Sequence, residues 1–242
     1  LDFFKHFIDS EMINVMVTEN NRHYLFVTKN LTHPLSQRLK SWVDTNADEM
    51  YLFIGVFMLF ALNSRTSIDA HWSTDPLLYS PIYSEIMPRD RFQLLLRMLH
   101  FVDNEIEQTD RLAKINNIFD IFKKNLSKKF YPYEKVCIDE SLMLFKGRLL
   151  FRQYIPSKAS RFGIKMFVIC DCRTGYILDV IIYTGSTTKY ASTEDPDLGV
   201  GAKVVMTLMS PYLNCGHKLY VDNWYTSPKL FQLLHDKKTN AV

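Results

Sequence analysis

The sequence has few of the residues that mark unstructured or heavily cross-linked proteins. Of its 242 residues, eight are glycine, nine are proline and four are cysteine. The low glycine and proline counts exclude low-complexity organisation. The cysteines fit no zinc-binding spacing and are too few for a disulfide-dense scaffold. We therefore expect reduced thiols in an intracellular compartment.

The chain also has a small net charge, and its apolar runs are short. The formal net charge is +3, so overall charge does not indicate a nucleic-acid partner, and any basic surface has to be local. The apolar run from Met50 to Leu62 is shorter than the roughly 20 residues that a membrane span needs. It predicts a buried core helix, and we expect no membrane contact. No secretory signal opens the chain, because residues 1–5 are already amphipathic.

Apolar residues, by contrast, are abundant enough for a sizeable core. Hydrophobic residues make up 47% of the chain, aromatic residues 14% and charged residues 23%, which are ordinary values for a globular protein. The length predicts one or two domains. The chain begins without methionine and stops at Val242 without a helix cap, so we expect it to be a truncated part of a larger fold.

The first part of the chain, to about residue 130, has apolar residues at helical spacing and predicts an all-α region. Asp9 precedes Glu11 as an N-cap precedes an acidic first turn. Thr45 and Asp48 frame a second helix start. Pro88 is expected to open a third helix.

From about residue 134 the period changes to that of strands. The predicted order is strand, strand, strand, helix, strand, helix, at residues 136–144, 164–170, 176–183, 199–213, 218–222 and from 227 onward. A short loop ending at Gly175 joins the second and third predicted strands, which is typical of a hairpin. This order matches the start of a ribonuclease H-like fold, an α/β fold in which a mixed sheet packs with helices.

Asp139 and Asp222 are the first candidates for chemistry. Each follows a short apolar strand, although aspartate is uncommon in strands. In a ribonuclease H-like sheet the two strands are neighbours, and ligands of open α/β sheets bind at the carboxyl ends of strands. Two carboxylates brought together there suit Mg²⁺ and two-metal phosphoryl transfer. The structural alternatives are a solvent-facing strand end for Asp139 and a turn for Asp222.

A basic segment lies between these two aspartates. Residues 146–165 contain six basic residues and no acidic residue, with aromatic residues interleaved. The basic residues are Lys146, Arg148, Arg152, Lys158, Arg161 and Lys165. Lysine and arginine beside a metal site suit a phosphodiester backbone, so we interpret the segment as a DNA-binding surface. A solvated hairpin face is the structural alternative.

Several runs of the sequence resemble the piggyBac transposase family. In the second half these are IDES at 138–141 with FKGR at 145–148, QYIPSK at 153–158, GIK at 163–165, TGY at 174–176 and YVDNWYTS at 220–227. In the first half they are WS at 72–73, MPRDRF at 87–92, LHF at 99–101 and DRL at 110–112. The resemblance covers nearly the whole chain, in order.

The resemblance implies a DDE-type transposase that cuts DNA at transposon ends with Mg²⁺ and joins the 3′-OH strands to TTAA target DNA. Asp139 and Asp222 match the first two catalytic, metal-binding aspartates of the family. The third aspartate is expected beyond Val242, so Mg²⁺ is expected in the complete enzyme and not in this fragment, which should be inactive by itself.

The resemblance also implies an organisation and partners. Residues 1–130 would be a helical dimerisation and DNA-binding region, and residues 131–242 the N-terminal part of the ribonuclease H-like DDE catalytic domain. The full-length protein would be a nuclear homodimer that binds transposon ends. Two alternatives stay open: a domesticated derivative that binds DNA or protein partners without cleavage, and a helical interaction module whose core is only a scaffold.

Overall fold

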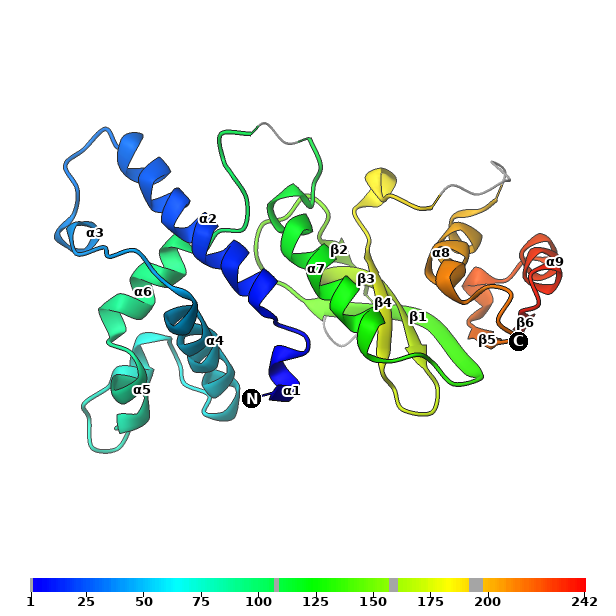
Figure 1. The fold of residues 1–242 in the computed structure, drawn as a ribbon, viewed down its shortest axis with the longest axis horizontal. Helices are drawn as coiled ribbons and strands as arrows, with labels where there is room; N and C mark the ends of the chain where they lie inside the picture. The colour runs from blue at the N-terminus through cyan, green and yellow to red at the C-terminus, as the bar shows by residue number, and fades with distance from the viewer. Residues whose placement is uncertain (1, 107–108, 157–160, 192–197) are drawn as a thin grey trace. The chain divides into compact units, whose positions relative to one another are not determined.

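The computed structural model describes residues 2–106, 109–156, 161–191 and 198–242 and shows a mixed α/β protein (Figure 1). The chain divides into two compact units. The first contains residues 1–109 and 113–121, and the second contains residues 110–112 and 122–242. No helix in the described part of the chain combines the length and the apolar character that crossing a membrane requires.

The first unit consists of helices, and the described residues before Lys135 contain no strand. The α-helices of this part of the chain are α1 (Asp2–Lys5), α2 (Ser10–Lys29), α3 (Gln37–Lys40), α4 (Ala47–Leu62), α5 (Pro81–Ile86), α6 (Arg89–Met98) and α7 (Ala113–Lys129), and η1 (Asp69–Trp72) is a 3₁₀ helix. The Asp9 carboxylate accepts a hydrogen bond from the Met12 N–H at 3.0 Å, which confirms the N-cap predicted for α2.

The start of α4 differs from the prediction. Asn46, not Thr45, is the N-cap, and its side-chain oxygen accepts from the Glu49 N–H at 3.0 Å. The Thr45 hydroxyl instead donates a hydrogen bond to the Glu49 carboxylate at 2.6 Å. Either residue type suits a cap, so local sequence alone does not separate them. The core of this unit lies between α2, α4 and α6, where Ile13, Phe53 and Phe92 are fully buried.

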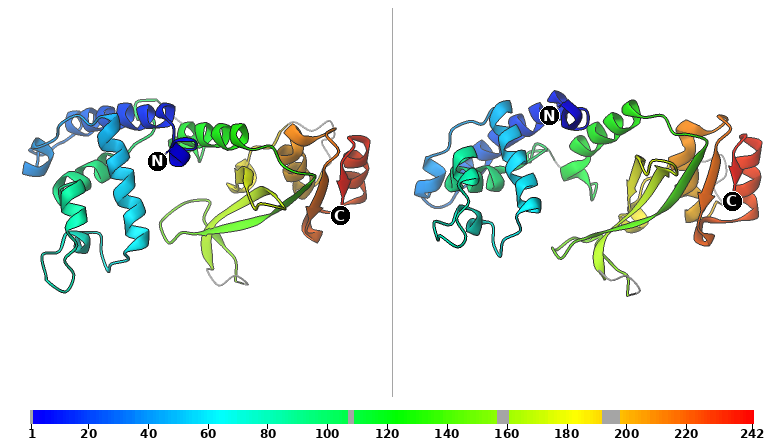
Figure 2. Two further views of the ribbon diagram at one scale, coloured as in Figure 1. Left: turned by 60° about the horizontal axis from the view of Figure 1, so that its bottom comes forward. Right: turned by 90° about the horizontal axis from the view of Figure 1, so that it is seen from below.

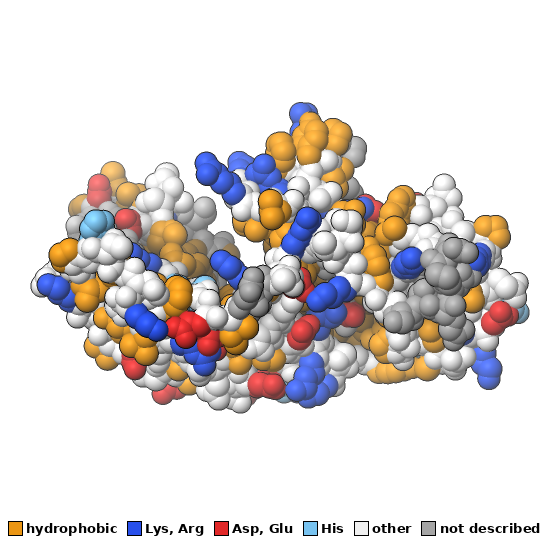
Figure 3. Space-filling view, turned by 90° about the horizontal axis from the view of Figure 1, so that it is seen from above, with side chains coloured by type: hydrophobic (Ala, Val, Ile, Leu, Met, Phe, Trp, Pro, Cys, Tyr) orange, Lys and Arg blue, Asp and Glu red, His pale blue; other side chains and the backbone are white. Residues whose placement is uncertain are grey.

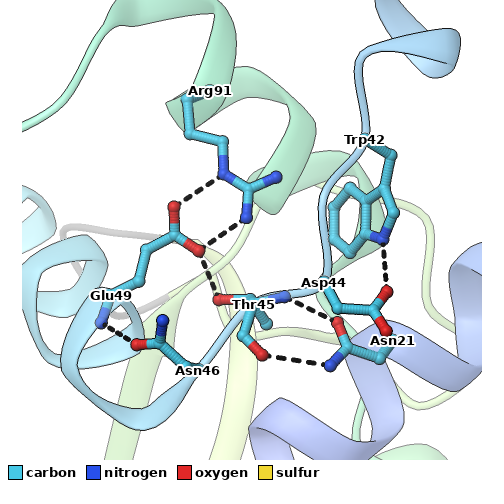
Figure 4. A network of polar contacts seen from close by, with 7 residues as sticks. All are labelled: Asn21, Trp42, Asp44, Thr45, Asn46, Glu49 and Arg91. Atoms are coloured by element: carbon cyan, nitrogen blue, oxygen red, sulfur yellow. Dashed lines mark hydrogen bonds and ion pairs between the residues drawn. The ribbon is translucent and has the colours of Figure 1, made fainter.

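A polar network joins α4 and α6 within this unit (Figure 4). The Arg91 guanidinium donates two hydrogen bonds of 2.6 Å to the Glu49 carboxylate and lies over the Trp42 ring, 4.9 Å from its centroid. Burial by itself would raise the pKa of Glu49, but the hydrogen bonds from Arg91 and Thr45 outweigh it and hold this pKa below its ordinary value. The pair therefore stabilises the unit above pH 4.5, the ordinary pKa of the carboxyl, and this stabilisation is lost as the pH falls through the lowered folded-state pKa.

Replacing Arg91 by lysine is expected to lower the free energy of unfolding by about 1–3 kcal/mol, because a lysine keeps the charge and cannot form the two-pronged contact. Urea denaturation followed by tryptophan fluorescence measures this loss. Arg38→Lys is the matched control, since Arg38 makes an exposed 3.5 Å ion pair with Asp90 and such pairs contribute little. Equal losses in the two variants would contradict the role of the network.

The second unit contains a mixed sheet with helices (Figure 1). Its strands are β1 (Lys135–Leu144), β2 (Gln153–Tyr154), β3 (Phe162–Asp171), β4 (Ile177–Ile182), β5 (Lys218–Val221) and β6 (Asn240–Ala241). Its helices after β4 are η2 (Gly185–Thr187), α8 (Val200–Met209), η3 (Ser210–Tyr212), η4 (Asn223–Tyr225) and α9 (Pro228–Asp236). The order along the sheet is β2-β3-β1-β5-β6, with β4 also paired to β3. All six predicted elements are present, and the two-residue strands β2 and β6 were not predicted.

The hairpin of β3 and β4 is fixed by Asp171, which is fully buried. Its carboxylate accepts from the backbone N–H groups of Tyr133, Arg173 and Thr174 at 2.8–3.1 Å. It also accepts from the Thr174 hydroxyl at 2.7 Å. Gly175 closes the loop with φ 71°, in the left-handed region that glycine adopts without strain. The predicted hairpin is therefore confirmed, and a buried aspartate organises it.

The core of the second unit lies between the sheet and the helices α8 and α9, which Figure 2 shows close together beside β5. Ile138 of β1, Phe167 of β3 and Leu219 of β5 pack in one cluster with Leu208 and Leu230 of the two helices. The α9 helix begins as the sequence predicts. Ser227 is its N-cap and accepts from the Leu230 N–H at 3.1 Å, with proline at the first helical position.

The two units divide within α7, between residues 121 and 122, whereas the sequence predicts a domain boundary at residue 130. Ile118 packs against the core of the first unit. In the second unit, the Tyr176 hydroxyl donates to the Leu126 carbonyl oxygen at 2.8 Å. The apolar residues of α7 keep the helical period along its whole length. The sequence pattern therefore does not reveal the residue at which α7 passes from the first unit to the second.

Candidate catalytic carboxylates and nucleic-acid interface

The pairing of β1 with β5 brings Asp139 and Asp222 together. The two strands run parallel, and the last aligned pair is Ile138 with Val221. Asp139 and Asp222 are the next residue on each strand, and the backbone of Asp222 is still extended. Since neighbouring strands lie about 4.8 Å apart, the two aspartates occupy adjacent positions where this ladder ends.

Each of the two carboxylates is exposed and is oriented by its own backbone. Asp139 Oδ1 accepts from the Glu140 N–H at 2.7 Å, and Asp222 Oδ1 accepts from the Asn223 N–H at 2.6 Å. Neither carboxylate forms an ion pair within the part of the chain that the structure describes. Two acidic residues therefore occupy adjacent positions without an ion-pair partner among the described residues, and a bound cation would relieve the repulsion between them.

Glu140 and Lys165 form an ion pair next to these carboxylates. The Lys165 ammonium donates to the Glu140 carboxylate at 2.7 Å. It also lies over three aromatic rings at 4.9–5.7 Å from their centroids, those of Phe167, Tyr183 and Trp224. Lys165 thus balances Glu140 inside the protein, with only 17% of its side chain exposed.

The predicted DNA-binding residues fall into two groups. The first group is exposed and consists of Lys146, Arg148 and Arg161. Arg152 is also exposed, but its guanidinium donates to the carbonyl oxygens of Lys146 and Gly147, both at 3.1 Å, and stacks over Phe162. It fixes the turn after β1, and Lys165 has the internal pairing described above.

Lys158, the sixth predicted residue, lies outside the described residues. Large apolar residues are exposed near the basic ones, including Leu150 at 89% and Tyr154 at 55%. Figure 3 shows basic and hydrophobic side chains next to each other on the face that it draws. Among the described residues of the basic segment, both basic and apolar side chains are therefore exposed.

The donor set at positions 139 and 222 fits a hard divalent cation, because carboxylate oxygens are the ligands that Mg²⁺ prefers. Within the described ranges, no three His, Cys, Asp or Glu side chains are grouped so as to hold a metal ion. The two carboxylates would supply only part of the octahedral oxygen shell of Mg²⁺, and its further ligands would have to come from water, substrate or other residues.

Sequence reasoning missed two features of this site. One is the Glu140–Lys165 pair, whose partners are 25 residues apart and meet only once β1 and β3 are in register. The other is Tyr225, which is 2% exposed and whose hydroxyl has no hydrogen-bond partner among the described residues. The YVDNWYTS run contains this tyrosine, but nothing in the run shows that its hydroxyl is buried.

The comparison with protein families gives one match over the whole chain. The family model described as Transposase IS4 matches residues 1–242. PiggyBac transposable element-derived protein 2 of Homo sapiens is 26% identical over 99% of this chain and 38% of its own length. PiggyBac transposable element-derived protein 3 of Homo sapiens is 26% identical over 94% of this chain and 36% of its own length. The chain thus spans less than two fifths of these two relatives.

A solved structure agrees with these matches. The cryo-EM structure of a piggyBac transposase synaptic complex with hairpin DNA contains a chain that is 30% identical, with a TM-score of 0.82. The match covers 98% of this chain and 49% of that one. The resemblance predicted from the motifs is confirmed, and this chain belongs to the piggyBac transposase family.

Proposed function

We propose that this chain carries the first part of the catalytic core of a cut-and-paste DDE transposase. The parallel alignment of Ile138 with Val221 carries this proposal, because it sets two exposed aspartates at adjacent positions where the β1–β5 ladder ends. In the full-length protein these carboxylates would help to cleave transposon ends and to transfer the 3′-OH strands to TTAA target DNA.

The strand order supports a ribonuclease H-like core. Strands β1, β3 and β4 are antiparallel neighbours, and β5 then joins β1 in parallel after α8. We propose that residues 131–242 form the N-terminal part of this DDE domain. Residues 1–130 would form an all-α region for dimerisation and DNA binding, in a nuclear homodimer.

The chemistry assigned to each residue follows from its position. Asp139 and Asp222 would hold Mg²⁺, which supplies Lewis-acid stabilisation of charge on the phosphoryl oxygens. Their backbone hydrogen bonds fix the Oδ1 atom of each carboxylate, and the Oδ2 atoms would be the metal ligands. The Glu140–Lys165 pair keeps the neighbouring acidic charge balanced, so the uncompensated negative charge is confined to the two aspartates.

DNA binding by the full-length protein is expected to depend on salt through Lys146 and Arg148. Both residues are exposed, and each lost phosphate contact reduces the slope of log affinity against log salt by about 0.9. Lys146→Gln and Arg148→Gln should therefore each flatten the slope on a transposon-end duplex. Fluorescence anisotropy titrations at several salt concentrations measure it.

The control for this titration is Lys135→Gln. Lys135 is exposed at the start of β1, whereas the basic segment follows the end of the same strand. Its slope should equal that of the wild type. A slope unchanged in the Lys146 and Arg148 variants would contradict the DNA-binding assignment and favour an interaction module whose core is a scaffold.

A second candidate function is a domesticated protein that binds DNA or protein partners without cleavage. The names of the two human relatives, both described as transposable element-derived proteins, favour it. A nicking assay of the full-length wild-type protein with Mg²⁺ and a transposon-end duplex separates the two functions. Nicked product supports the transposase, and intact DNA binding without product supports the domesticated protein.

A further inference from the structure

Two histidines of the first unit, His23 of α2 and His100 after α6, stack face to face. Their ring centroids are 4.1 Å apart, and the ring planes differ by 8°. Asn104 joins the two rings, because its Oδ1 atom accepts from His100 Nε2 at 2.7 Å and its Nδ2 atom donates to His23 Nδ1 at 2.8 Å. All three side chains are half-buried. These three residues, which we call the His–Asn cluster, tie residues 101–106 to α2.

A single amide cannot serve two fully protonated rings. Its oxygen accepts and its NH₂ group donates, so one of the two facing ring nitrogens has to carry a proton and the other has to be bare. Turning the amide over exchanges the two roles and leaves this requirement unchanged. His100 can therefore be charged while His23 is neutral. A proton on both facing nitrogens would leave one of them opposite the NH₂ group and would stack two positive rings on each other.

The surroundings of His23 also oppose its protonation. Burial lowers the pKa of His23 below its ordinary value of 6.5, and the charges of His100 and Lys114 lower it further. The cluster therefore stabilises the first unit fully above pH 6.5, and this stabilisation is lost as the pH falls through the lowered folded-state pKa of His23. A cavity of about 320 Å³ adjoins His23 and Asn104, so protons can reach the rings.

Ion pairs balance the other charged groups of α2 and of residues 101–106. Arg22 pairs with Glu19 at 2.8 Å and with Asp103 at 3.4 Å. Lys29 pairs with Glu105 at 3.2 Å. The basic side chains of these pairs are exposed, Arg22 by 45% and Lys29 by 74%, and exposed ion pairs contribute little to stability. The His–Asn cluster is thus the stronger attachment of residues 101–106 to α2.

We propose that the His–Asn cluster is a proton-operated latch, which holds residues 101–106 on α2 while one of the two rings is uncharged and releases them when both rings are charged. The latch is independent of the chemistry proposed for the second unit. His100 itself stays on α2, since its N–H donates to the Asn20 side-chain oxygen at 2.7 Å. The released residues lead into α7, within which the chain passes from the first unit to the second.

The test follows position 106 by ¹⁹F NMR in the full-length protein, with trifluoromethyl-phenylalanine in place of Ile106, which is 61% exposed. The linewidth reports the motion of the label, and the ¹³Cε1 signals of His23 and His100 report the charge of each ring in the same titration, from about pH 8 to about pH 5. The line should stay broad while one ring is charged and should narrow as the second ring gains its proton. An unchanged linewidth after both rings are protonated would overturn the inference.

Asn104→Asp separates the latch from a general loosening by acid. A carboxylate accepts from both rings and has no donor to oppose the second proton. The line of this variant should therefore stay broad at about pH 5, where that of the wild type has narrowed, and its second protonation should move to higher pH. His33→Gln is the matched control, because His33 is exposed and lies outside the cluster; its line should narrow as in the wild type. Narrowing of Asn104→Asp at the same pH as the wild type would contradict the latch.

Discussion

Asparagine at position 139 is expected to abolish DNA cleavage by the full-length protein while leaving DNA binding nearly intact. The substitution removes a negative oxygen ligand from the pair at the end of the β1–β5 ladder. A bound metal contributes several kcal/mol of charge stabilisation to phosphoryl transfer, and each 1.36 kcal/mol is tenfold in rate. The expected loss is therefore about 10³-fold or more. Asparagine has nearly the same size as aspartate, so the DNA-binding surface changes little.

The measurement is a nicking assay on a transposon-end duplex with Mg²⁺, beside a binding titration on the same DNA. Asp236→Asn is the matched control, because Asp236 is exposed at the end of α9 and contacts Gln232 at 2.9 Å. Nicking by Asp139→Asn at the rate of the wild type would refute the catalytic assignment. A loss of DNA binding equal to the loss of nicking would show that the substitution acts on binding instead.

Alanine at position 171 is expected to cost about 3–5 kcal/mol of the free energy of unfolding of the second unit. The buried carboxylate is the acceptor for three backbone N–H groups and one hydroxyl, and buried donors left without an acceptor cost about 1–3 kcal/mol each before water replaces part of the loss. Asp171→Asn should cost less. Its amide oxygen can still accept the hydrogen bonds from Thr174, whereas its NH₂ group faces the Tyr133 N–H and only that hydrogen bond is lost.

The pH dependence gives this prediction a sign. Burial alone would raise the pKa of Asp171, but the hydrogen bonds from Thr174, Tyr133 and Arg173 outweigh it and lower this pKa. The stabilisation is therefore complete above the ordinary value of 3.8 and is lost as the pH falls through the folded-state pKa.

Hydrogen exchange of the β3–β4 hairpin at neutral pH, measured by mass spectrometry, reports the stability of the second unit locally. Exchange in the hairpin should accelerate strongly in Asp171→Ala, less in Asp171→Asn, and not at all in Asp236→Ala, which removes an exposed carboxylate. A hairpin exchange rate in Asp171→Ala equal to that of the wild type would contradict the structural role of this aspartate.

Local sequence signals predicted those parts of the fold that depend on a few neighbouring residues. Ser227 followed by proline predicted the start of α9, and Asp9 predicted the start of α2, because a cap uses only the next three residues. The loop ending at Gly175 predicted the β3–β4 hairpin for the same reason. Asn46 was missed in favour of Thr45, because two adjacent polar residues both suit the cap and a tertiary contact with Glu49 occupies Thr45.

The sequence singled out the two aspartates of the candidate site but not the contacts of the residues around them. Asp139 and Asp222 stand out as aspartates after apolar strands, and the expected strand order placed them near each other. The register that aligns Ile138 with Val221 is set by packing across the sheet and is absent from the sequence pattern. Lys165 shows the limit most clearly, because as one of six basic residues it predicted a phosphate contact, whereas the structure pairs it with Glu140.

We propose that Asp139 and Asp222 hold one divalent cation between them. Fe²⁺ substituted for Mg²⁺ in the full-length protein, with ascorbate and peroxide, cleaves the polypeptide where the metal is bound. We expect cuts near both residue 139 and residue 222, suppressed by excess Mg²⁺ and lost in Asp139→Asn. Cuts near only one of these positions, or cuts that persist unchanged in Asp139→Asn, would contradict it.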